Sequence, residues 1–237
     1  MDFAEIRRFA LADADALVEG GVDGLMIENF GDVPFYAARV PAHTIAFLTA
    51  VAVEVKARCP LPLGINVLRN DGMAAIAIAT AVGAEYVRIN VYTGARLADQ
   101  GILQGEAHEI ARYRHTLGGK AQIWADVAVK HSAALGQRSL ADEVEDSLKR
   151  GLADAVIVSG SATGKPTPLE DVVTVKRHAG AAPVYIGSGV DEGTIGRLLE
   201  VADGVIVGTA VKRGGEVSAP VDARRVRTLM SMVRRNP

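Results

Sequence analysis

Cysteine is almost absent from the sequence, because Cys59 is the only one among 237 residues. No intrachain disulfide can form, which excludes a small secreted domain held together by disulfides. Cys59 stands just before Pro60, where a predicted helix ends, and no histidine lies beside it in the sequence. We therefore expect a structural thiol there and not a nucleophile.

An excess of charge of one sign is also missing. The chain has 26 Lys and Arg against 28 Asp and Glu, a formal net charge of −2, which gives no electrostatic basis for nucleic-acid binding. It lacks an uninterrupted apolar run of ~18 residues, the length that a membrane-spanning helix needs. Its first residues lack the cationic and apolar segments of a signal peptide. From the lack of a disulfide pair, a signal peptide and a membrane span we expect a soluble, cytoplasmic protein. Because 49% of the residues are hydrophobic, we also expect a sizeable core.

The sequence does contain a short pattern of residues that occurs four times, which we call the recurring phrase. An amphipathic segment ends, an acidic residue follows, and a short apolar run rich in β-branched residues begins, at 21–27, 83–89, 151–157 and 201–207. A glycine at the first three of these ends suits a left-handed helix C-cap. Apolar runs with little polar alternation are typical of strands buried on both faces of a parallel sheet.

Three further strands fit at 62–69, 122–130 and 183–189, so the expected strands begin near Asp23, Pro62, Tyr86, Gln122, Ala155, Val184 and Gly204. Helices are expected over 4–19, 40–58, 71–81, 105–117, 139–149, 168–178, 192–200 and 220–234. Strands that alternate with helices at this period predict βαβ units and a parallel sheet.

Seven strands and eight helices are one strand short of a (β/α)8 barrel. We therefore predict an α/β fold, a TIM barrel that apparently lacks its first strand in this chain, forming a single domain over residues 1–237. The same count predicts ~20–30 further residues upstream, scaled to one βα unit, with a short apolar run followed by Pro and Gly.

Glycine-rich segments end the last two expected strands. They contain Gly187, Ser188 and Gly189 on the seventh barrel strand, and Gly208 and Thr209 on the eighth. Barrels that hold phosphorylated ligands commonly bind the phosphate there, because small residues let backbone N–H groups approach its oxygens. The alternative is that these glycines only permit tight turns.

One nucleotide-binding motif is excluded. Residues 159–166 resemble a phosphate-binding loop, but the spacing is one residue short and Pro166 replaces the required Ser or Thr. Lys165 is left with two interpretations, contact with an anion or a solvated position in a loop.

Polar side chains interrupt the carboxyl ends of the earlier strands. Strand alternation places Arg88 with Asn90, and Asp126 with Lys130, on one face. If that face points into the barrel, the convergent side chains are Glu28, Asn66, Arg88, Asn90 and Asp126.

Two interpretations of this cluster stay open. It is either an ion-pair network of Arg88 with Glu28 or Asp126, or a functional site. In the second, Glu28 or Asp126 is a general acid/base or a ligand of a divalent metal such as Mg²⁺, and Arg88 binds an anion. Lys130 would form either a Schiff base or a salt bridge with Asp126.

These segments resemble the BtpA/SgcQ family. The resemblance is carried by residues 23–35, 64–71, 88–94, 125–127, 130–131 and 160–167, and it runs from about Asp13 to about Arg213. It implies a barrel of the ribulose-phosphate-binding type, and it links the cyanobacterial namesake to photosystem I biogenesis and another member to a sugar-utilisation cluster. It implies no established reaction. Family members usually begin with an apolar strand and a Pro/Gly-rich loop, which this chain lacks.

Two functional hypotheses follow. The first is an enzyme of sugar-phosphate or nucleotide-type metabolism that acts on a small phosphorylated ligand by isomerase, lyase or hydrolase chemistry. The alternative is a non-catalytic assembly or stability factor of the photosystem I biogenesis type. The polar cluster favours the enzyme, because a scaffold has no need to bury such groups. The partners that we expect are this ligand and, for a homo-oligomer, further copies of the chain.

Overall fold

The computed structural model describes residues 2–129, 131–160 and 166–233. Seven parallel strands form one curled sheet in the order β1-β2-β3-β6-β8-β9-β10. They are β1 (Leu25–Glu28), β2 (Leu63–Asn66), β3 (Tyr86–Ile89), β6 (Gln122–Val127), β8 (Ala155–Val158), β9 (Val184–Ile186) and β10 (Gly204–Val205). All seven strands predicted from the sequence are present.

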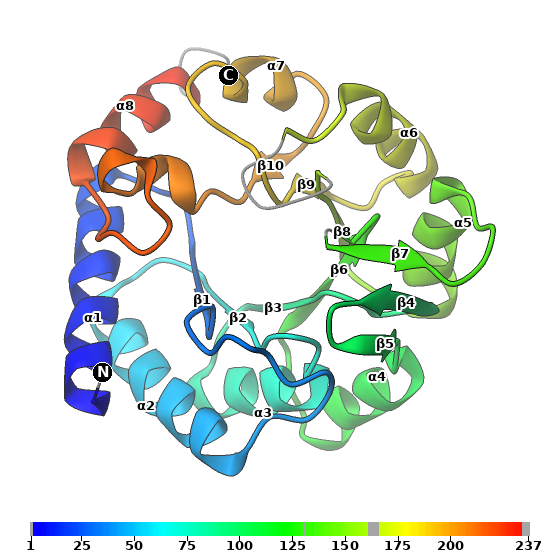
Figure 1. Cartoon of the computed structure of the whole chain (residues 1–237), viewed down its shortest axis with the longest axis horizontal. Coiled ribbons are helices and arrows are strands. Elements are labelled where there is room, and N and C mark those ends of the chain that lie inside the picture. Colours follow the sequence, from blue (N-terminus) through cyan, green and yellow to red (C-terminus); the bar gives the residue numbers. More distant parts are fainter. Residues whose placement is uncertain (1, 130, 161–165, 234–237) are drawn as a thin grey trace.

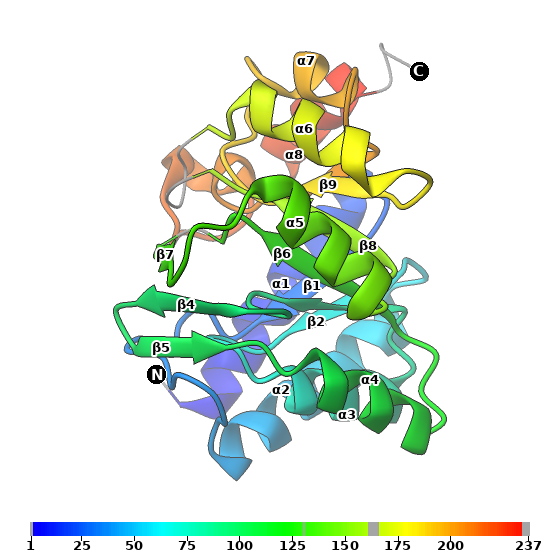
Figure 2. The same cartoon turned by 90° about the vertical axis from the view of Figure 1, so that its right-hand side faces the viewer.

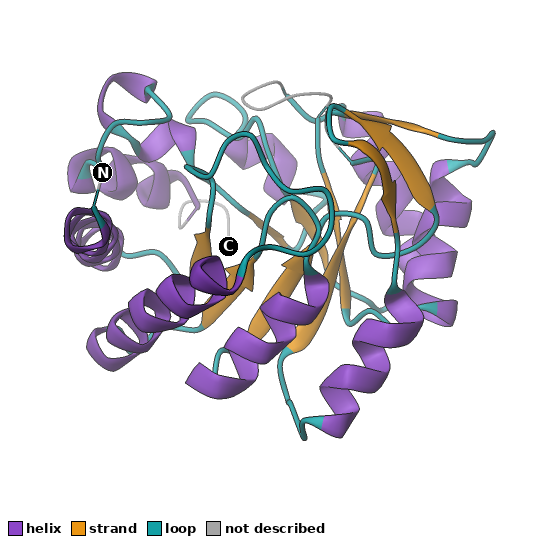
Figure 3. Cartoon of the chain, turned by 60° about the horizontal axis from the view of Figure 1, so that its bottom comes forward, coloured by secondary structure: helices purple, strands orange, loops and turns teal. Residues whose placement is uncertain are grey.

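Eight α-helices surround this sheet (Figures 1 and 3). They are α1 (Phe3–Gly20), α2 (Ala42–Arg58), α3 (Gly72–Val82), α4 (Ala107–Thr116), α5 (Leu140–Glu145), α6 (Leu169–Ala179), α7 (Ile195–Leu199) and α8 (Ala223–Val233). A π-helix, η1 (Asp146–Arg150), continues α5, and two 3-10 helices, η2 (Thr209–Val211) and η3 (Arg213–Gly215), follow β10. The predicted alternation of strands and helices is confirmed. Of the helices in the described ranges, none is both long and apolar enough to cross a membrane.

Local sequence explains where several helices begin and end. The side chains of Asp2 and Asp71 cap the first turns of α1 and α3, and Ser139 forms a capping box with Asp142 at α5. Gly21 and Gly83 end α1 and α3 with φ of 87° and 71°, as predicted.

The left-handed C-cap predicted at Gly151 is wrong. Gly151 has φ of −80°, and the neighbouring Leu152 has the left-handed φ of 60°. A Cβ on Gly151 would lie 2.7 Å from Cε1 of Tyr92 and 2.8 Å from the Ser147 carbonyl oxygen. Glycine is therefore needed at 151 for close packing and not for its backbone conformation.

The helices close a ring, whereas the described sheet does not. Gly20 of α1 packs directly on Val226 of α8, where a Cβ would overlap the valine side chain. Within the described residues, β1 pairs only with β2, and β10 pairs only with β9. The two edge strands therefore lie on either side of the place where a further strand was predicted from the sequence.

The acidic residue of the recurring phrase connects neighbouring strands at their amino ends. The carboxylates of Glu85, Asp154 and Asp203 accept the backbone N–H of Leu63, Ile123 and Val184 at 2.7, 2.8 and 2.7 Å, respectively. The backbone N–H of each acid donates in return to the carbonyl of the same residue.

We call each acidic residue, with its hydrogen bonds to the neighbouring strand, a clamp. A basic residue in the last turn of a helix pairs with the acid of each clamp. Lys56, Arg114 and Lys176 form ion pairs with Glu85, Asp154 and Asp203, respectively. The clamps join β3 to β2, β8 to β6 and β10 to β9. Asp23, the fourth acid of the phrase, is exposed and makes no hydrogen bond or ion pair with the described part of the chain.

A second, antiparallel sheet was not predicted. Its order is β5-β4-β7, and its strands are β4 (Ala95–Ala98), β5 (Gly101–Gln104) and β7 (Ser132–Ala134). Figure 2 shows this small sheet projecting beyond the parallel strands. Residues 92–94 and 99–101 flank the two ends of β4, and Gly101 has the left-handed φ of 93°. Arg96 of β4 ties the sheet to α5 through Glu143, at 2.9 Å.

Candidate functional site

Strand alternation separates two populations of side chains in the parallel sheet. The outward side chains of β1 to β10, such as Ile65, Val87 and Val156, pack against the helices in two apolar clusters. The inward side chains form a different set. They are Met26, Glu28, Gly64, Asn66, Tyr86, Arg88, Asn90, Gln122, Trp124, Asp126, Ala155, Ile157, Ser159, Tyr185, Gly187, Gly204, Ile206 and Gly208.

Aromatic rings fill the amino-terminal end of the inner face. Trp124 stacks between Tyr86 and Tyr185, with ring centroids 3.9 and 4.1 Å apart. Gly64 and Gly204 leave room for this stack, since a Cβ on either would press into the Tyr86 or Tyr185 ring. The charged side chains of the inner face, Glu28, Arg88 and Asp126, lie at the carboxyl-terminal end instead.

Arg88, Asn90 and Asp126 form one hydrogen-bonded cluster at that end. Arg88 donates from Nε to Asp126 Oδ1 and from Nη2 to Oδ2, both at 2.8 Å, and Asn90 Nδ2 donates to the same Oδ2 at 3.0 Å. The side chains of Arg88 and Asp126 are 4% and 0% exposed. Burial acts to lower the pKa of Arg88, but the carboxylate of Asp126 holds it above its usual value. The predicted ion pair of Arg88 is thus formed with Asp126.

Glu28 and Asn66 lie on the neighbouring strands β1 and β2. Asn66 Nδ2 donates to Glu28 Oε2 at 3.2 Å, and Asn66 is buried while Glu28 is partly exposed. Both oxygens of Asp126 accept hydrogen bonds within the protein, whereas Glu28 is partly open to solvent. Of the two predicted carboxylates, Glu28 is therefore the one with more freedom to contact a ligand.

Arg69 is a charged residue of this region that the sequence interpretation missed. It follows β2 and is only 5% exposed. Burial lowers the pKa of Arg69, and the charges of Asp126, Asp99 and Glu28 act against that shift. Arg69 could have been identified from the sequence, because it interrupts the end of an apolar run just as Arg88 does.

The glycine-rich ends of β9 and β10 differ in their surroundings. A Cβ on Gly187 would lie 2.5 Å from Ser159 Oγ and 3.0 Å from Arg88 Nη2, so this glycine makes room for interior side chains. Ser188 Oγ accepts the N–H of Gly160 at 3.0 Å, which ties the ends of β8 and β9 together. Gly189 has the left-handed φ of 69°.

Open space borders the end of β10 instead. A Cβ on Gly208 would meet nothing within 4 Å, and Thr209 follows it as the first residue of η2. Gly208 is thus a predicted phosphate-binding position that leaves room for a ligand.

Two predicted site residues, Lys130 and Lys165, lie outside the described residues. Among the other residues of the resembling segments, several brace the loops at the carboxyl ends of the strands. Asn29 bonds to the backbone N–H and carbonyl of Leu68, and Asn70 bonds in the same way to Val91. These motif positions therefore have a structural explanation.

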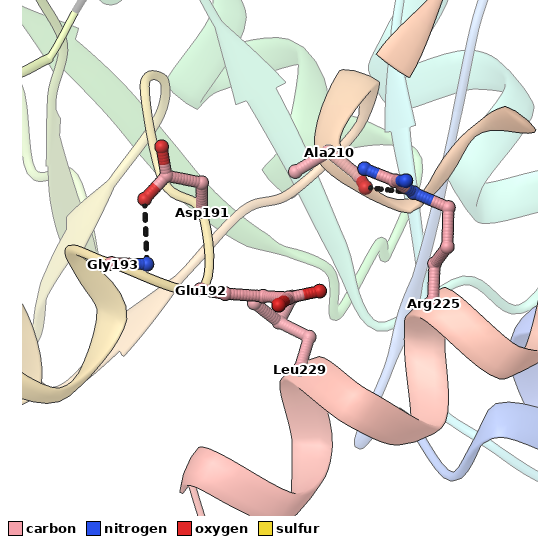
Figure 4. A pocket seen from close by; sticks show the side chains of 6 residues that line it. All are labelled: Asp191, Glu192, Gly193, Ala210, Arg225 and Leu229. Carbon is pink, nitrogen blue, oxygen red and sulfur yellow. Dashed lines mark hydrogen bonds between the residues drawn. The ribbon is translucent and has the colours of Figure 1, made fainter. Parts of the chain in front are cut away.

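Two cavities lie near this end of the barrel. One of about 350 Å³ lies between the loop after β9, η2 and α8 (Figure 4). There Arg225 Nε donates to the Ala210 carbonyl at 2.8 Å, and Asp191 and Glu192 also line the cavity. These two carboxylates oppose binding of an anion, and the described lining contains no predicted site residue. A smaller cavity of about 40 Å³ reaches Asp126 from beneath β4.

The residues present do not offer a ready metal site. In the described ranges, no group of three or more His, Cys, Asp or Glu side chains lies close enough together to hold a metal ion. Mg²⁺ at Glu28 or Asp126 therefore stays a prediction without a described set of ligands.

Comparisons with known proteins agree with this architecture. A family model described as the BtpA family matches residues 1–235. The photosystem I biogenesis protein BtpA of Synechocystis sp. is 46% identical over 214 residues, covering 90% of this chain and 75% of that protein. An uncharacterized protein of Thermococcus kodakarensis is 44% identical over 235 residues, covering 98% and 88%.

Solved structures with similar folds are TIM-barrel enzymes. N-(5'-phosphoribosyl)anthranilate isomerase from Pyrococcus furiosus matches with a TM-score of 0.62 at 14% identity, covering 94% of this chain and 93% of that one. Orotidine 5'-phosphate decarboxylase from Pyrococcus horikoshii matches with a TM-score of 0.61 at 14% identity, covering 98% and 95%. The predicted barrel fold is confirmed.

Proposed function

The chain belongs to the BtpA family, and from that membership and its inner face we propose that it is an enzyme acting on a small phosphorylated metabolite. The observation that carries the proposal is the buried cluster of Arg88, Asn90 and Asp126 beside the glycine-rich end of β9. Burying charge is costly, so such a cluster at the ligand-binding end of a barrel favours a functional site over a scaffold.

The proposed roles follow the positions of the groups. The phosphate would lie against residues 187–189 and 208–209, with Lys165 as a further cation. The N–H of Gly187 already donates to the Val158 carbonyl at 2.8 Å, so this residue would not donate its N–H to the phosphate. Arg88 would face the anionic ligand, with Asn66 and Asn90 as hydrogen-bonding groups. Glu28 would transfer protons, because it is the carboxylate with solvent access. Asp126 would hold Arg88 and Asn90 in position, and Lys130 is proposed beside it.

Support also comes from the names of the barrels with similar folds, two of which refer to phosphoribosyl or 5'-phosphate compounds. Fold alone does not determine function, so these names indicate a class of ligand and no reaction. Sugar-phosphate and nucleotide-type ligands both belong to that class, and isomerase, lyase or hydrolase chemistry is compatible with it. A non-catalytic assembly role rests on the name of the cyanobacterial relative alone, and relatives of similar identity in archaea do not carry it.

The test is binding of inorganic phosphate and of ethyl phosphate, measured by isothermal titration calorimetry. Gly208→Asp places a carboxylate in the open space at the end of β10, and we expect it to weaken phosphate affinity by about 1–3 kcal/mol. Gly208→Asn is the matched control, since it has the same size without the charge and should weaken binding much less. Equal affinities for the two variants and the unsubstituted protein would contradict the proposal.

The structure also affects the choice of position for this test. Gly189→Asp, the substitution that the sequence alone suggests, would force a side chain into a left-handed backbone conformation. Gly208 has φ of −121°, so a variant there changes charge without that strain.

A further inference from the structure

We propose that Asn90 and Ser159 determine the specificity of this site by requiring ligand hydroxyl groups, so that the phosphorylated ligand is a polyol or a sugar. This inference rests on the proposed function. It starts from two buried polar atoms on the inner face, Asn90 Oδ1 and Ser159 Oγ, that have no hydrogen-bond partner among the described residues. Buried polar groups are nearly always paired in proteins, so an unpaired one requires an explanation.

The orientation of the Asn90 amide is fixed by its neighbour. Its Nδ2 donates to Asp126 Oδ2 at 3.0 Å, and a carboxylate can only accept. The amide oxygen must therefore point away from Asp126. Asn90 is only 2% exposed, so bulk water does not satisfy this oxygen. A carbonyl oxygen accepts only, so the group that pairs with it has to be a donor, such as a hydroxyl.

Ser159 lies just beyond β8, beside the segment proposed to bind phosphate. It is 3% exposed, and its Oγ lies against the space that Gly187 leaves by having no Cβ. The next backbone N–H, that of Gly160, is bonded to Ser188 Oγ, which fixes the end of β8 relative to the glycine-rich end of β9. Neighbouring strands lie about 4.8 Å apart, so a hydroxyl close to a bound phosphate can reach Ser159.

The chemistry of these groups favours a polyol over a nucleotide base. Asn90, Asp126 and Ser159 stand on or just beyond β3, β6 and β8, which are consecutive in the sheet, and the first and last present an unpaired acceptor or hydroxyl. Several hydroxyls along one ligand match such a row. Among the inward-facing residues of the described strands, the aromatic rings lie at the opposite, amino-terminal end, so this row offers no ring on which a base could stack.

The experiment compares phosphomonoesters with and without hydroxyl groups by isothermal titration calorimetry. Ethyl phosphate carries none, glycerol 3-phosphate and ribose 5-phosphate carry several, and adenosine 5'-monophosphate adds a base. We expect the unsubstituted protein to bind at least one of the two polyol phosphates about tenfold more tightly than ethyl phosphate, equivalent to about 1.4 kcal/mol. Ser159→Ala should reduce this preference to within about threefold and leave ethyl phosphate binding unchanged.

A matched control is provided by Thr80 of α3, whose Oγ1 is also buried without a partner but faces Gly119 and not the inner face. Both Ser159→Ala and Thr80→Val remove an unpaired buried hydroxyl, so both should melt at the same or a higher temperature than the unsubstituted protein. Only Ser159→Ala should lose the preference for polyols. Asn90→Ala is the second variant, and the same loss of preference is expected.

Four outcomes would overturn the inference. Equal binding of all phosphomonoesters by the unsubstituted protein, or a polyol preference that survives in Ser159→Ala and Asn90→Ala, would overturn it and leave the proposed function standing. Tighter binding of adenosine 5'-monophosphate that Ser159→Ala does not change would assign a base-binding site instead. Failure of every compound, inorganic phosphate included, would overturn the proposed function as well.

Discussion

Asp126 accepts three hydrogen bonds from two side chains, and none of its carboxylate is exposed. Removing one partner of such a buried pair leaves the other charge without compensation. We therefore expect Asp126→Asn to lower the free energy of unfolding by about 3–5 kcal/mol, as measured by urea denaturation.

The matched control for this residue is Glu19, which pairs with Arg227 at 2.8 Å while both side chains are about half exposed or more. Glu19→Gln should change the free energy of unfolding by less than about 1 kcal/mol, as is usual for exposed pairs. A loss below about 1 kcal/mol for Asp126→Asn as well, together with loss of ligand binding, would contradict the structural role and assign Asp126 to the ligand.

At the scale of single residues, the sequence predicts which side chains converge but not how they pair. Alternation alone places Arg88, Asn90 and Asp126 on the inner face. Whether Arg88 pairs with Glu28 or Asp126 depends on the register between strands far apart in the sequence, and no local pattern encodes that register. Ser159 was missed for a related reason, because a serine after an apolar run resembles an ordinary turn residue until its neighbours are known.

At the scale of elements, the acidic clamp formed by Asp203 predicts how the stability of the fold depends on pH. Partial burial acts to raise the pKa of Asp203, but Lys176 and the N–H of Val184 bring it below its ordinary value. A carboxyl whose pKa is depressed in the folded state contributes stability above its unfolded pKa, and this contribution is lost as the pH falls through the folded pKa. Stability should therefore decrease as the pH falls below about 4.

Asp203→Asn removes the titrating group and keeps the shape of the side chain. We expect this variant to be less stable than the unsubstituted protein at pH 7, and the difference to shrink as the pH falls below about 4. Thermal unfolding at pH 3 to 7 measures both effects. Asp191, an exposed acid on the loop after β9, is the control position, and a difference for Asp203→Asn that is independent of pH would contradict the prediction.

The properties of single elements also explain which of them could be predicted from the sequence. Long apolar runs and capped amphipathic segments locate the seven parallel strands and the eight helices, because their own residues bury most of the surface that stabilises them. The sheet of β4, β5 and β7 escapes, because its residues are partly or fully exposed apart from Leu103 and therefore form no continuous apolar run. The pairing of β4 with β7 also depends on contacts between distant segments, such as Arg96 with Ser132 at 2.7 Å.

At the scale of the whole molecule, the three clamps follow the same rule around the sheet. Each clamp runs from the acid before one strand to the first residues of the neighbouring strand that precedes it in the chain. Asp23 occupies the same place in the phrase before β1, and the neighbour that it would clamp is the strand on the unpaired edge of β1. The helices already close the ring at Gly20 and Val226, and within the described residues β1 and β10 each pair with one strand only.

This regularity sharpens the prediction of a further strand. In the chain as given, Asp23→Asn should change the free energy of unfolding by no more than about 0.5 kcal/mol, because Asp23 is exposed and has no described partner. A chain extended before Met1 by ~20–30 residues, one βα unit that contains an apolar strand followed by Pro and Gly, should be more stable, because the strand pairs two open edges.

In the extended chain, Asp23 should accept the first N–H of the added strand, and Asp23→Asn should then cost about 1.5–3 kcal/mol, the contribution of one hydrogen bond to a charged group. Urea denaturation of the four proteins, with and without the extension and the substitution, measures this coupling as a double-mutant cycle. Asp203→Asn is the positive control, since its clamp is complete in both backgrounds. An extension that adds no stability, or an effect of Asp23→Asn that is the same in both chains, would mean that the edges of β1 and β10 do not accept a strand in this way.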